Sequence, residues 1–239
     1  MAEPADRVLV ALDVDTLAAA DRLLGQLGGV VTGCKVGSQL FTAAGPAAVE
    51  LAKKRGFRVF LDLKYHDIPN TVAGTVREAT RLGVFMLNVH ASGGLAMMRA
   101  AVEAASKAAA ELAVPRPLVI AVTVLTSLDR RTLQREVGVP ATVEGHVMAL
   151  AERARAAGLD GCVASPQETH ALRRALGRDW VIVTPGVRPV SGGDDQVRTA
   201  TPKAALDAGS DYLVIGRPIT AAPDPAAAAR AILADLARP

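Results

Sequence analysis

The stretch "FRVFLDLKYHDIPNTV", residues 57–72, joins three kinds of sequence that alternate along the whole chain. It opens as an apolar run of strand length, gathers charged side chains at its centre, and continues into "IPNTV", where the proline suits the first turn of a helix. Asp62 and Lys64 are two positions apart, so on an extended strand they point to the same side, about 7 Å apart along the chain. The stretch predicts a buried strand that ends in charges and turns at once into a helix.

The same pattern recurs eight times. Apolar runs of strand length, several of them rich in Val and Ile, lie at 7–13, 30–37, 57–63, 84–90, 117–125, 159–165, 180–186 and 211–217. Amphipathic helical patterns lie at 15–27, 45–55, 70–82, 93–111, 142–157, 166–176, 201–209 and 224–237. Strands that are apolar on both faces are typical of parallel sheets covered by helices.

This alternation predicts an α/β protein in which residues 1–239 form a single (β/α)8 (TIM) barrel, because the count and the chain length both match that fold. A doubly wound open sheet is the structural alternative. It usually needs fewer strands, and no G-x-G-x-x-G motif follows the first strand of this chain.

Composition narrows the classes of function. Half of the residues are hydrophobic, only 3% are aromatic, and the net charge is +3. The basic residues form short pairs on helical stretches and there are few rings to stack on bases, so we expect no nucleic-acid partner. No segment is long and apolar enough to span a membrane, and the N-terminus does not resemble a signal peptide. Cys34 and Cys162 lack paired spacing, so we predict a reducing, cytoplasmic setting.

Polar residues stand at the predicted carboxyl ends of the strands, where barrel enzymes place their active sites. They are Asp13, Lys35, Asp62, Lys64, His90, Thr123, Ser127 and Arg217, and Pro185 and Gly216 stand with them at the strand ends. Asp13 also suits the N-cap of the following helix. That explanation fails for Lys35 and Lys64, since a cation at a helix N-terminus opposes the helix dipole. We therefore expect alternating charges to meet in one network, with a purely structural ion-pair network as the alternative.

At these residues the sequence resembles the orotidine 5′-monophosphate decarboxylase family, over nearly the whole chain, 7–220. "LDLKYHDIPNTV" is similar to the family's Asp-x-Lys-x-x-Asp-Ile-Pro-x-Thr block. Six further blocks occur in the family's order, namely "VALDVD", "CKVGSQLF", "VTVLTS", "TPGVRP", "DDQVRTATP" and "VIGRPIT". The resemblance implies decarboxylation of orotidine 5′-monophosphate to UMP, with no cofactor and no metal.

The resemblance also implies roles for the charged residues. Lys64 would protonate C6 of the pyrimidine as carbon dioxide leaves, and Asp62 would lie against the substrate carboxylate. Asp13 and Lys35 would contact the ribose and tie the charge network together. Asp67 would reach, with Ile68 and Thr71, into the neighbouring subunit's site in a homodimer with shared active sites.

Further residues would bind the rest of the nucleotide. Ser127 would bond the pyrimidine and Pro185 would pack near the base. The phosphate would be held by Gln196, Arg217 and the Gly216 backbone, with Arg188 close by. The long, glycine-containing segment 186–200 between strand and helix is the candidate lid over this phosphate.

Two alternatives stay open at this point. Related phosphosugar enzymes, the hexulose-phosphate synthases and ketogulonate-phosphate decarboxylases, share the Asp-x-Lys-x-x-Asp block, but they use Mg²⁺ and place a glutamate where this chain has Lys35. The second alternative is a non-catalytic barrel that only binds nucleotide monophosphates. Loss of Lys64 or Asp62 would mark such a protein, and both are present.

Overall fold

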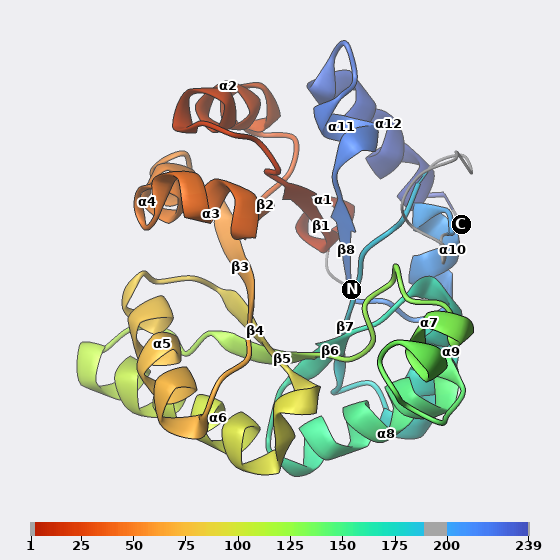
Figure 1. Ribbon diagram of the computed structural model, residues 1–239. Helices are drawn as coiled ribbons and strands as arrows, with labels where there is room; N and C mark the ends of the chain where they lie inside the picture. Colours follow the sequence, from red (N-terminus) through yellow and green to blue (C-terminus); the bar gives the residue numbers. More distant parts are fainter. Residues whose placement is uncertain (1–2, 189–199, 239) are drawn as a thin grey trace.

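Eight parallel strands close into a barrel in the order β1 to β8 (Figure 1). This computed structural model describes residues 3–188 and 200–238. The strands are β1 Val8–Ala11, β2 Gly33–Gly37, β3 Arg58–Tyr65, β4 Met86–His90, β5 Leu118–Val122, β6 Gly161–Val163, β7 Val181–Thr184 and β8 Tyr212–Ile215. β1 pairs with β8, in the register Val8 to Leu213, and so closes the sheet. The predicted (β/α)8 barrel is confirmed and an open sheet is excluded, while the treatment of 1–239 as a single domain stays a prediction.

Helices surround the barrel. They are α1 Pro4–Arg7, α2 Leu17–Leu27, α3 Ser38–Ala44, α4 Ala47–Lys54, α5 Pro69–Arg81, α6 Gly94–Leu112, α7 Arg130–Arg135, α8 Val143–Ala156, α9 Pro166–Leu176, α10 Pro202–Asp207, α11 Arg217–Thr220 and α12 Pro225–Leu236, with a 3-10 turn η1 at Ala91–Gly93. In the described part of the chain, none of them is both long and apolar enough to cross a membrane.

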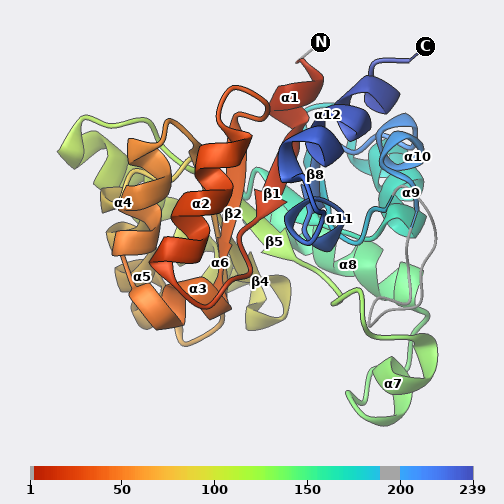
Figure 2. The ribbon, with the colours of Figure 1, turned by 90° about the horizontal axis from the view of Figure 1, so that it is seen from above.

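The sequence prediction missed several short helices. α3 precedes the predicted helix at 45–55, and α7 lies between β5 and α8, where Figure 2 shows it standing out from the barrel. α7 begins where the Asp129 side chain accepts a hydrogen bond from the Thr132 backbone N–H at 2.7 Å, which is a typical N-cap. At this length the helix has no room for the apolar periodicity on which the prediction relied.

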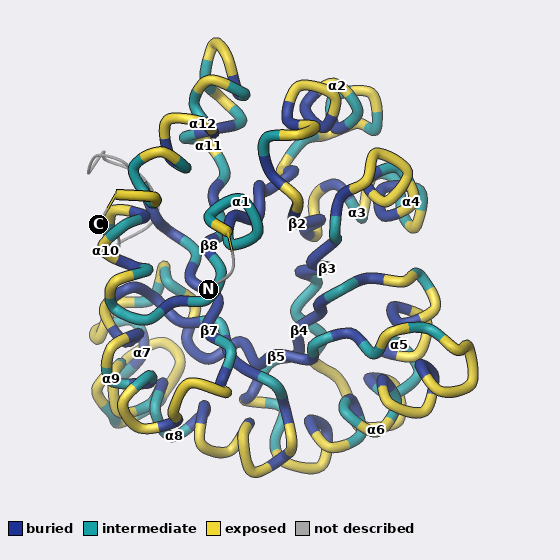
Figure 3. The backbone as a smooth tube through the Cα atoms, turned by 180° about the vertical axis from the view of Figure 1, so that it is seen from behind, coloured by how far each residue is buried: buried dark blue, intermediate teal, exposed yellow. Residues whose placement is uncertain are grey.

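The core has two layers of side chains. Figure 3 shows that buried residues concentrate on the strands, while the helices also carry exposed ones. Between strands and helices lies a large aliphatic cluster. Inside the barrel a smaller cluster is built from Leu9, Phe60, Met86, Ile120 and Val183, all almost fully buried. The barrel interior is therefore filled by side chains, as in other closed barrels of this size.

The opposite, amino-terminal base of the barrel is fastened by arginine–carboxylate pairs. Arg173 on α9 contacts Asp211 at 2.6 Å, and Asp211 also accepts a hydrogen bond from a β7 backbone N–H at 2.7 Å. Arg116 contacts Asp160 at 2.9 Å, and Asp160 accepts from a β5 backbone N–H at 2.7 Å. Each carboxylate thus joins an arginine to the start of a strand.

Candidate active site

A cavity of about 660 Å³ opens at the carboxyl-terminal mouth of the barrel. Its walls include eight of the residues predicted from the sequence, namely Asp13, Lys35, Asp62, Lys64, Pro185, Arg188, Gly216 and Arg217. Its floor includes apolar side chains of the barrel interior, such as Phe60 and Val183. The structure therefore brings together most of the strand-end residues in one polar site above an apolar floor.

Four of these residues form a chain of alternating charges. Lys35 Nζ lies 2.8 Å from Asp13 Oδ1 and 3.5 Å from Asp62 Oδ2, and Lys64 Nζ lies 2.9 Å from Asp62 Oδ1. The side chains of Lys35 and Asp62 are only 9% and 13% exposed, whereas Lys64 is 36% exposed. The inner lysine and aspartate fix each other, and Lys64 is the more exposed of the two lysines in the cavity wall.

Asp13 belongs to this network and does not cap a helix. The side chain of Thr16 caps α2 by accepting a hydrogen bond from Ala19 N at 3.2 Å. Gly37 makes room for the Lys35–Asp13 pair, because a Cβ added at Gly37 would lie 2.6 Å from Lys35 Nζ and 3.2 Å from Asp13 Oδ1. The absence of a side chain at Gly37 therefore leaves the space that the ion pair occupies.

The end of β3 is not the regular strand that the spacing of Asp62 and Lys64 predicted. β3 pairs with β4 as Leu61 to Leu87 and next as Tyr65 to Val89, so the register shifts within the charged segment. Lys64 adopts a left-handed backbone conformation with φ of 53°, which is uncommon for a residue other than glycine. Lys64 still reaches Asp62, but through a bulge that the alternation rule does not foresee.

Asn88 on β4 is a site side chain that the sequence prediction left out. It is fully buried, its Nδ2 donates to Asp62 Oδ1 at 2.7 Å, and its Oδ1 accepts from the Lys64 backbone N–H at 2.8 Å. The signal was present in the sequence as one amide inside the apolar run "MLNVH". A buried polar side chain in such a run needs a partner, and here the partners are the two central residues of the site.

His90 ends β4 beside the charged network. Its ring centroid lies 5.4 Å from that of His66, with the rings tilted by 30°. Partial burial lowers the pKa of His90 below its ordinary value, and the nearby His66 and Lys64 lower it further, against an opposing effect of Asp62. The lowered pKa of His90 favours its neutral form at the edge of the site.

The arginines lie on the far wall of the cavity, on the β7 and β8 side. Arg188 follows β7, and its backbone N–H donates to Ala200 O at 2.9 Å across an isolated bridge between Val187 and Ala200. Arg217 begins α11 directly after Gly216 at the end of β8. Gln196 and most of the candidate lid segment 186–200 lie outside the described residues.

The remaining predicted residues do not line the cavity. Ser127 lies exposed in the turn after β5, and its neighbour Thr126 lines the wall instead. Asp67, Ile68 and Thr71 lie exposed where α5 begins, with Ile68 66% exposed and the Asp67 carboxylate accepting from the Ile68 backbone N–H at 2.6 Å. The "DLKYHDIPNTV" stretch therefore turns its first two charges inward and its third outward.

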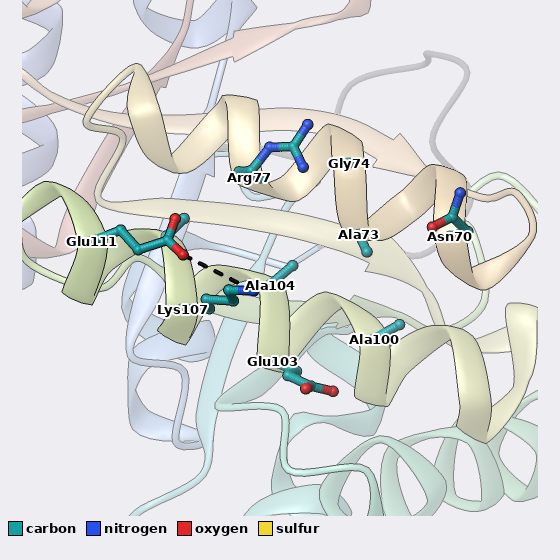
Figure 4. A pocket seen from close by; sticks show the side chains of 10 residues that line it. Asn70, Ala73, Gly74, Arg77, Ala100, Glu103, Ala104, Lys107 and Glu111 are labelled. Atoms are coloured by element: carbon teal, nitrogen blue, oxygen red, sulfur yellow. Dashed lines mark ion pairs between the residues drawn. The ribbon is translucent and has the colours of Figure 1, made fainter.

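A second hollow of about 590 Å³ lies on the outer surface between α5 and α6 (Figure 4). Small side chains such as Ala73 and Ala104 line it, and Lys107 and Glu111 pair at 4.0 Å along its α6 side. It contains no strand-end residue, and its α5 side begins at Asn70, next to the exposed Asp67–Thr71 segment. Among the residues that the structure describes, no group of three or more His, Cys, Asp and Glu side chains could hold a metal ion.

Comparison with known proteins gives one consistent picture. The profile described as the orotidine 5′-phosphate decarboxylase / HUMPS family matches residues 6–232. The orotidine 5′-phosphate decarboxylase of Moorella thermoacetica is 60% identical over 233 residues, which cover 97% of this chain and 92% of that protein. The enzyme of the same name from Heliobacterium modesticaldum is 50% identical, over 98% of this chain and 97% of that one. The crystal structure of orotidine 5′-phosphate decarboxylase from Lactobacillus acidophilus superposes with a TM-score of 0.87 at 37% identity, and covers 98% of this chain and 100% of that chain.

Proposed function

The chain belongs to the orotidine 5′-phosphate decarboxylase / HUMPS family, and we propose on that premise that it converts orotidine 5′-monophosphate to UMP and carbon dioxide in pyrimidine biosynthesis. The observation that carries this proposal is the Lys64–Asp62 pair, joined through Lys35 to Asp13 at the mouth of the barrel. The cavity of about 660 Å³ lies in the range of small-molecule sites and suits a mononucleotide.

The chemistry explains why such a site needs a fixed cation. Loss of carbon dioxide from C6 of the pyrimidine leaves a carbanion in an sp² orbital, with no adjacent carbonyl group to delocalise it. A preplaced positive charge in a site that excludes water stabilises this carbanion most where the charge develops. Lys64 supplies that charge from the cavity wall and then donates the proton to C6.

The other charges orient this lysine and the substrate. Asp62 lies against the substrate carboxylate and holds Lys64 at 2.9 Å, while Lys35 and Asp13 contact the ribose. Neutralisation of Asp62 from two sides allows a buried carboxylate to persist next to the substrate. The network is thus fixed before the substrate arrives, which reduces reorganisation during the reaction.

The arginine wall suits the opposite end of the nucleotide. Arg188 and Arg217 bind the phosphate together with the Gly216 backbone and Gln196. Pro185 packs against the base from the cavity wall, and the turn after β5, which carries Ser127 and lines the wall with Thr126, contacts the pyrimidine. Binding energy at the phosphate then contributes to the reaction at C6, some distance away.

A homodimer with shared active sites is part of the proposal. Asp67, Ile68 and Thr71 lie exposed outside the cavity of their own chain, with Ile68 66% exposed, so they are accessible to a second subunit. The hollow between α5 and α6 continues this surface and offers small side chains for packing. Both cysteines are free, buried thiols, which fits the proposed cytoplasmic setting.

The direct test adds orotidine 5′-monophosphate to the protein in EDTA and follows the loss of pyrimidine absorbance. We expect turnover without added metal. Turnover only after addition of Mg²⁺, with sugar phosphates as substrates, would instead indicate the phosphosugar chemistry. A folded protein that binds UMP but never turns over would indicate the non-catalytic barrel.

Subunit mixing tests the shared site. Lys64→Ala and Asp67→Ala chains are each expected to be inactive as homodimers, but their heterodimer holds one site with both native residues. After exchange in equal amounts, about a quarter of all sites should therefore be native and activity should return. If mass spectrometry shows exchanged subunits and no activity returns, Asp67 does not act across the interface.

A further inference from the structure

We propose that Asn88 is a positioning residue for decarboxylation, because one buried amide fixes both the Asp62 carboxylate and the backbone at Lys64. The inference rests on the proposed function. It concerns a fully buried side chain that is not among the residues that line the cavity. Its effect on the reaction must therefore pass through its two neighbours on β3.

The first neighbour is the Lys64 backbone. Three residues separate Leu61 from Tyr65 on β3, but their partners Leu87 and Val89 on β4 are separated by one, so β3 bulges at this point. In the bulge Lys64 takes a left-handed conformation, which persists in a non-glycine residue only where the surroundings hold it. The hydrogen bond from Lys64 N to Asn88 Oδ1, at 2.8 Å, is the contact that holds it from β4.

The second neighbour is the Asp62 carboxylate. Asn88 Nδ2 donates to Asp62 Oδ1 at 2.7 Å, and Lys64 Nζ lies 2.9 Å from the same oxygen. Lys35 Nζ lies 3.5 Å from the other oxygen, Oδ2. The amide fixes the carboxylate plane without adding charge, so the two lysines keep their places on either side of it.

Only a side chain with a donor and an acceptor on one short planar group can do both. Reversing the Asn88 amide would place its oxygen against the Asp62 carboxylate and its NH₂ against the Lys64 N–H, so the structure permits one orientation. Aspartate has the same shape but, when ionised, it accepts only. When protonated, its O–H can donate to Asp62 while its carbonyl oxygen accepts from Lys64, which reproduces the amide.

This equivalence provides a test that a merely structural role would not pass. In Asn88→Asp the introduced carboxyl lies against a carboxylate, so it should hold a proton to higher pH than a free aspartate. At high pH it is ionised and repels Asp62, and as the pH falls it becomes protonated and restores both hydrogen bonds. The activity of Asn88→Asp relative to wild type should therefore rise as the pH falls.

The groups that titrate around the introduced carboxyl are Asp62 and Lys64 on β3, Lys35 on β2, and His90 with its ring neighbour His66 at the cavity edge. These groups are present in both the wild-type protein and the variant. The substrate phosphate, which also titrates, is the same in both assays. The ratio of variant to wild-type kcat/KM at each pH therefore isolates the change at Asn88.

The experiment measures kcat and KM for wild type, Asn88→Asp and Asn88→Ala from pH 5.5 to 8.5, with UMP binding and thermal unfolding alongside. For Asn88→Ala we expect kcat to fall about 10²-fold at every pH, as for loss of an orienting partner, with KM and UMP affinity within about 3-fold of wild type. For Asn88→Asp we expect a comparable loss at pH 8.5 and a gain of about 10-fold relative to wild type by pH 5.5.

Thr184→Val is the matched control. Thr184 is also fully buried at a strand end and hydrogen-bonded through its side chain to Ser210, but it lies outside the cavity walls. This variant should lose stability while its kcat stays close to wild type across the pH range. Equal pH profiles for Asn88→Asp and wild type, or kcat of a folded Asn88→Ala within about 3-fold of wild type, would overturn the inference. Inactive wild-type protein would instead overturn the proposed function.

Discussion

The two ends of the barrel use the same kinds of charge in opposite ways. At the base, Asp160 and Asp211 each bind an arginine and a strand backbone N–H. Arg173 donates in addition to the backbone carbonyls of Gly209 and Trp180. At the mouth, Lys35, Asp62 and Lys64 bind mainly one another and face a cavity.

The difference shows how a barrel separates stability from reactivity. Charges at the base are saturated by groups that the fold itself supplies, so their removal should mainly change the free energy of unfolding. Charges at the mouth leave part of their hydrogen-bonding capacity for a ligand, so their removal should mainly change activity. Four measurements sharpen or break this comparison.

The largest expected effect is at the mouth. Lys64→Ala removes the cation and the proton donor together, so kcat/KM should fall by at least about 10⁴-fold. The midpoint of thermal unfolding should stay close to wild type, because this side chain is 36% exposed. Steady-state kinetics and a thermal melt measure both, with Lys54→Ala on the exposed end of α4 as the control that should change neither.

The next effect is at the base. Arg173→Ala leaves Asp211 without its arginine and three backbone carbonyls without this donor, so we expect a loss of about 3 kcal/mol in the free energy of unfolding. For a chain of this size that corresponds to a fall of about 10 °C in the unfolding midpoint. Below the transition, kcat should match wild type.

Arg174→Ala is the control for the base, since Arg174 is the exposed neighbour on the same helix and should change the midpoint little. A fall in kcat of Arg173→Ala at a temperature where it is fully folded would break the separation between the two ends.

A smaller effect links pH to stability at the edge of the mouth. The pKa of His90 is lower in the folded protein than its ordinary value, chiefly through burial, so the unfolded chain takes up this proton first as the pH falls. His90 therefore costs no stability well above pH 6.5 and destabilises the fold as the pH drops below about that value. Between pH 7.5 and 5.5 the unfolding midpoint of His90→Gln should fall less than that of wild type. An equal fall of the unfolding midpoint in both proteins would show that His90 does not contribute to the pH dependence of stability.

The smallest expected effect is in the reactivity of the two thiols, which should be equally low in the native protein. Burial raises the pKa of both Cys34, on β2, and Cys162, near Trp180, to about 12. Neither should react with a thiol reagent at pH 8 in the native protein, and both should react after unfolding in guanidinium. Faster native labelling of either cysteine would reveal local opening at its position in the barrel.

Local sequence patterns were enough to predict the barrel architecture and most of the charged residues at its carboxyl-terminal mouth. The spacing of apolar runs determined eight strands and their helices, because burial on both faces leaves a periodicity that is readable in a short window. Because the carboxyl ends of parallel strands meet at one end of a barrel, the strand-end positions predicted that five charged residues lie close together. These are Asp13, Lys35, Asp62, Lys64 and Arg217. The sequence did not predict short helices such as α7, because its 6 residues are too few to show an apolar periodicity.

Only the tertiary structure decided how these residues meet. The bulge in β3, the left-handed Lys64 and the buried Asn88 depend on the register between β3 and β4, which is set by hydrogen bonds between segments far apart in sequence. The same shift ends the alternation that placed Asp62 and Lys64 on one side, and beyond it Asp67 turns away from the cavity. The sequence shows which charged residues stand at strand ends. The pairing of the strands determines which partner each of their side chains contacts.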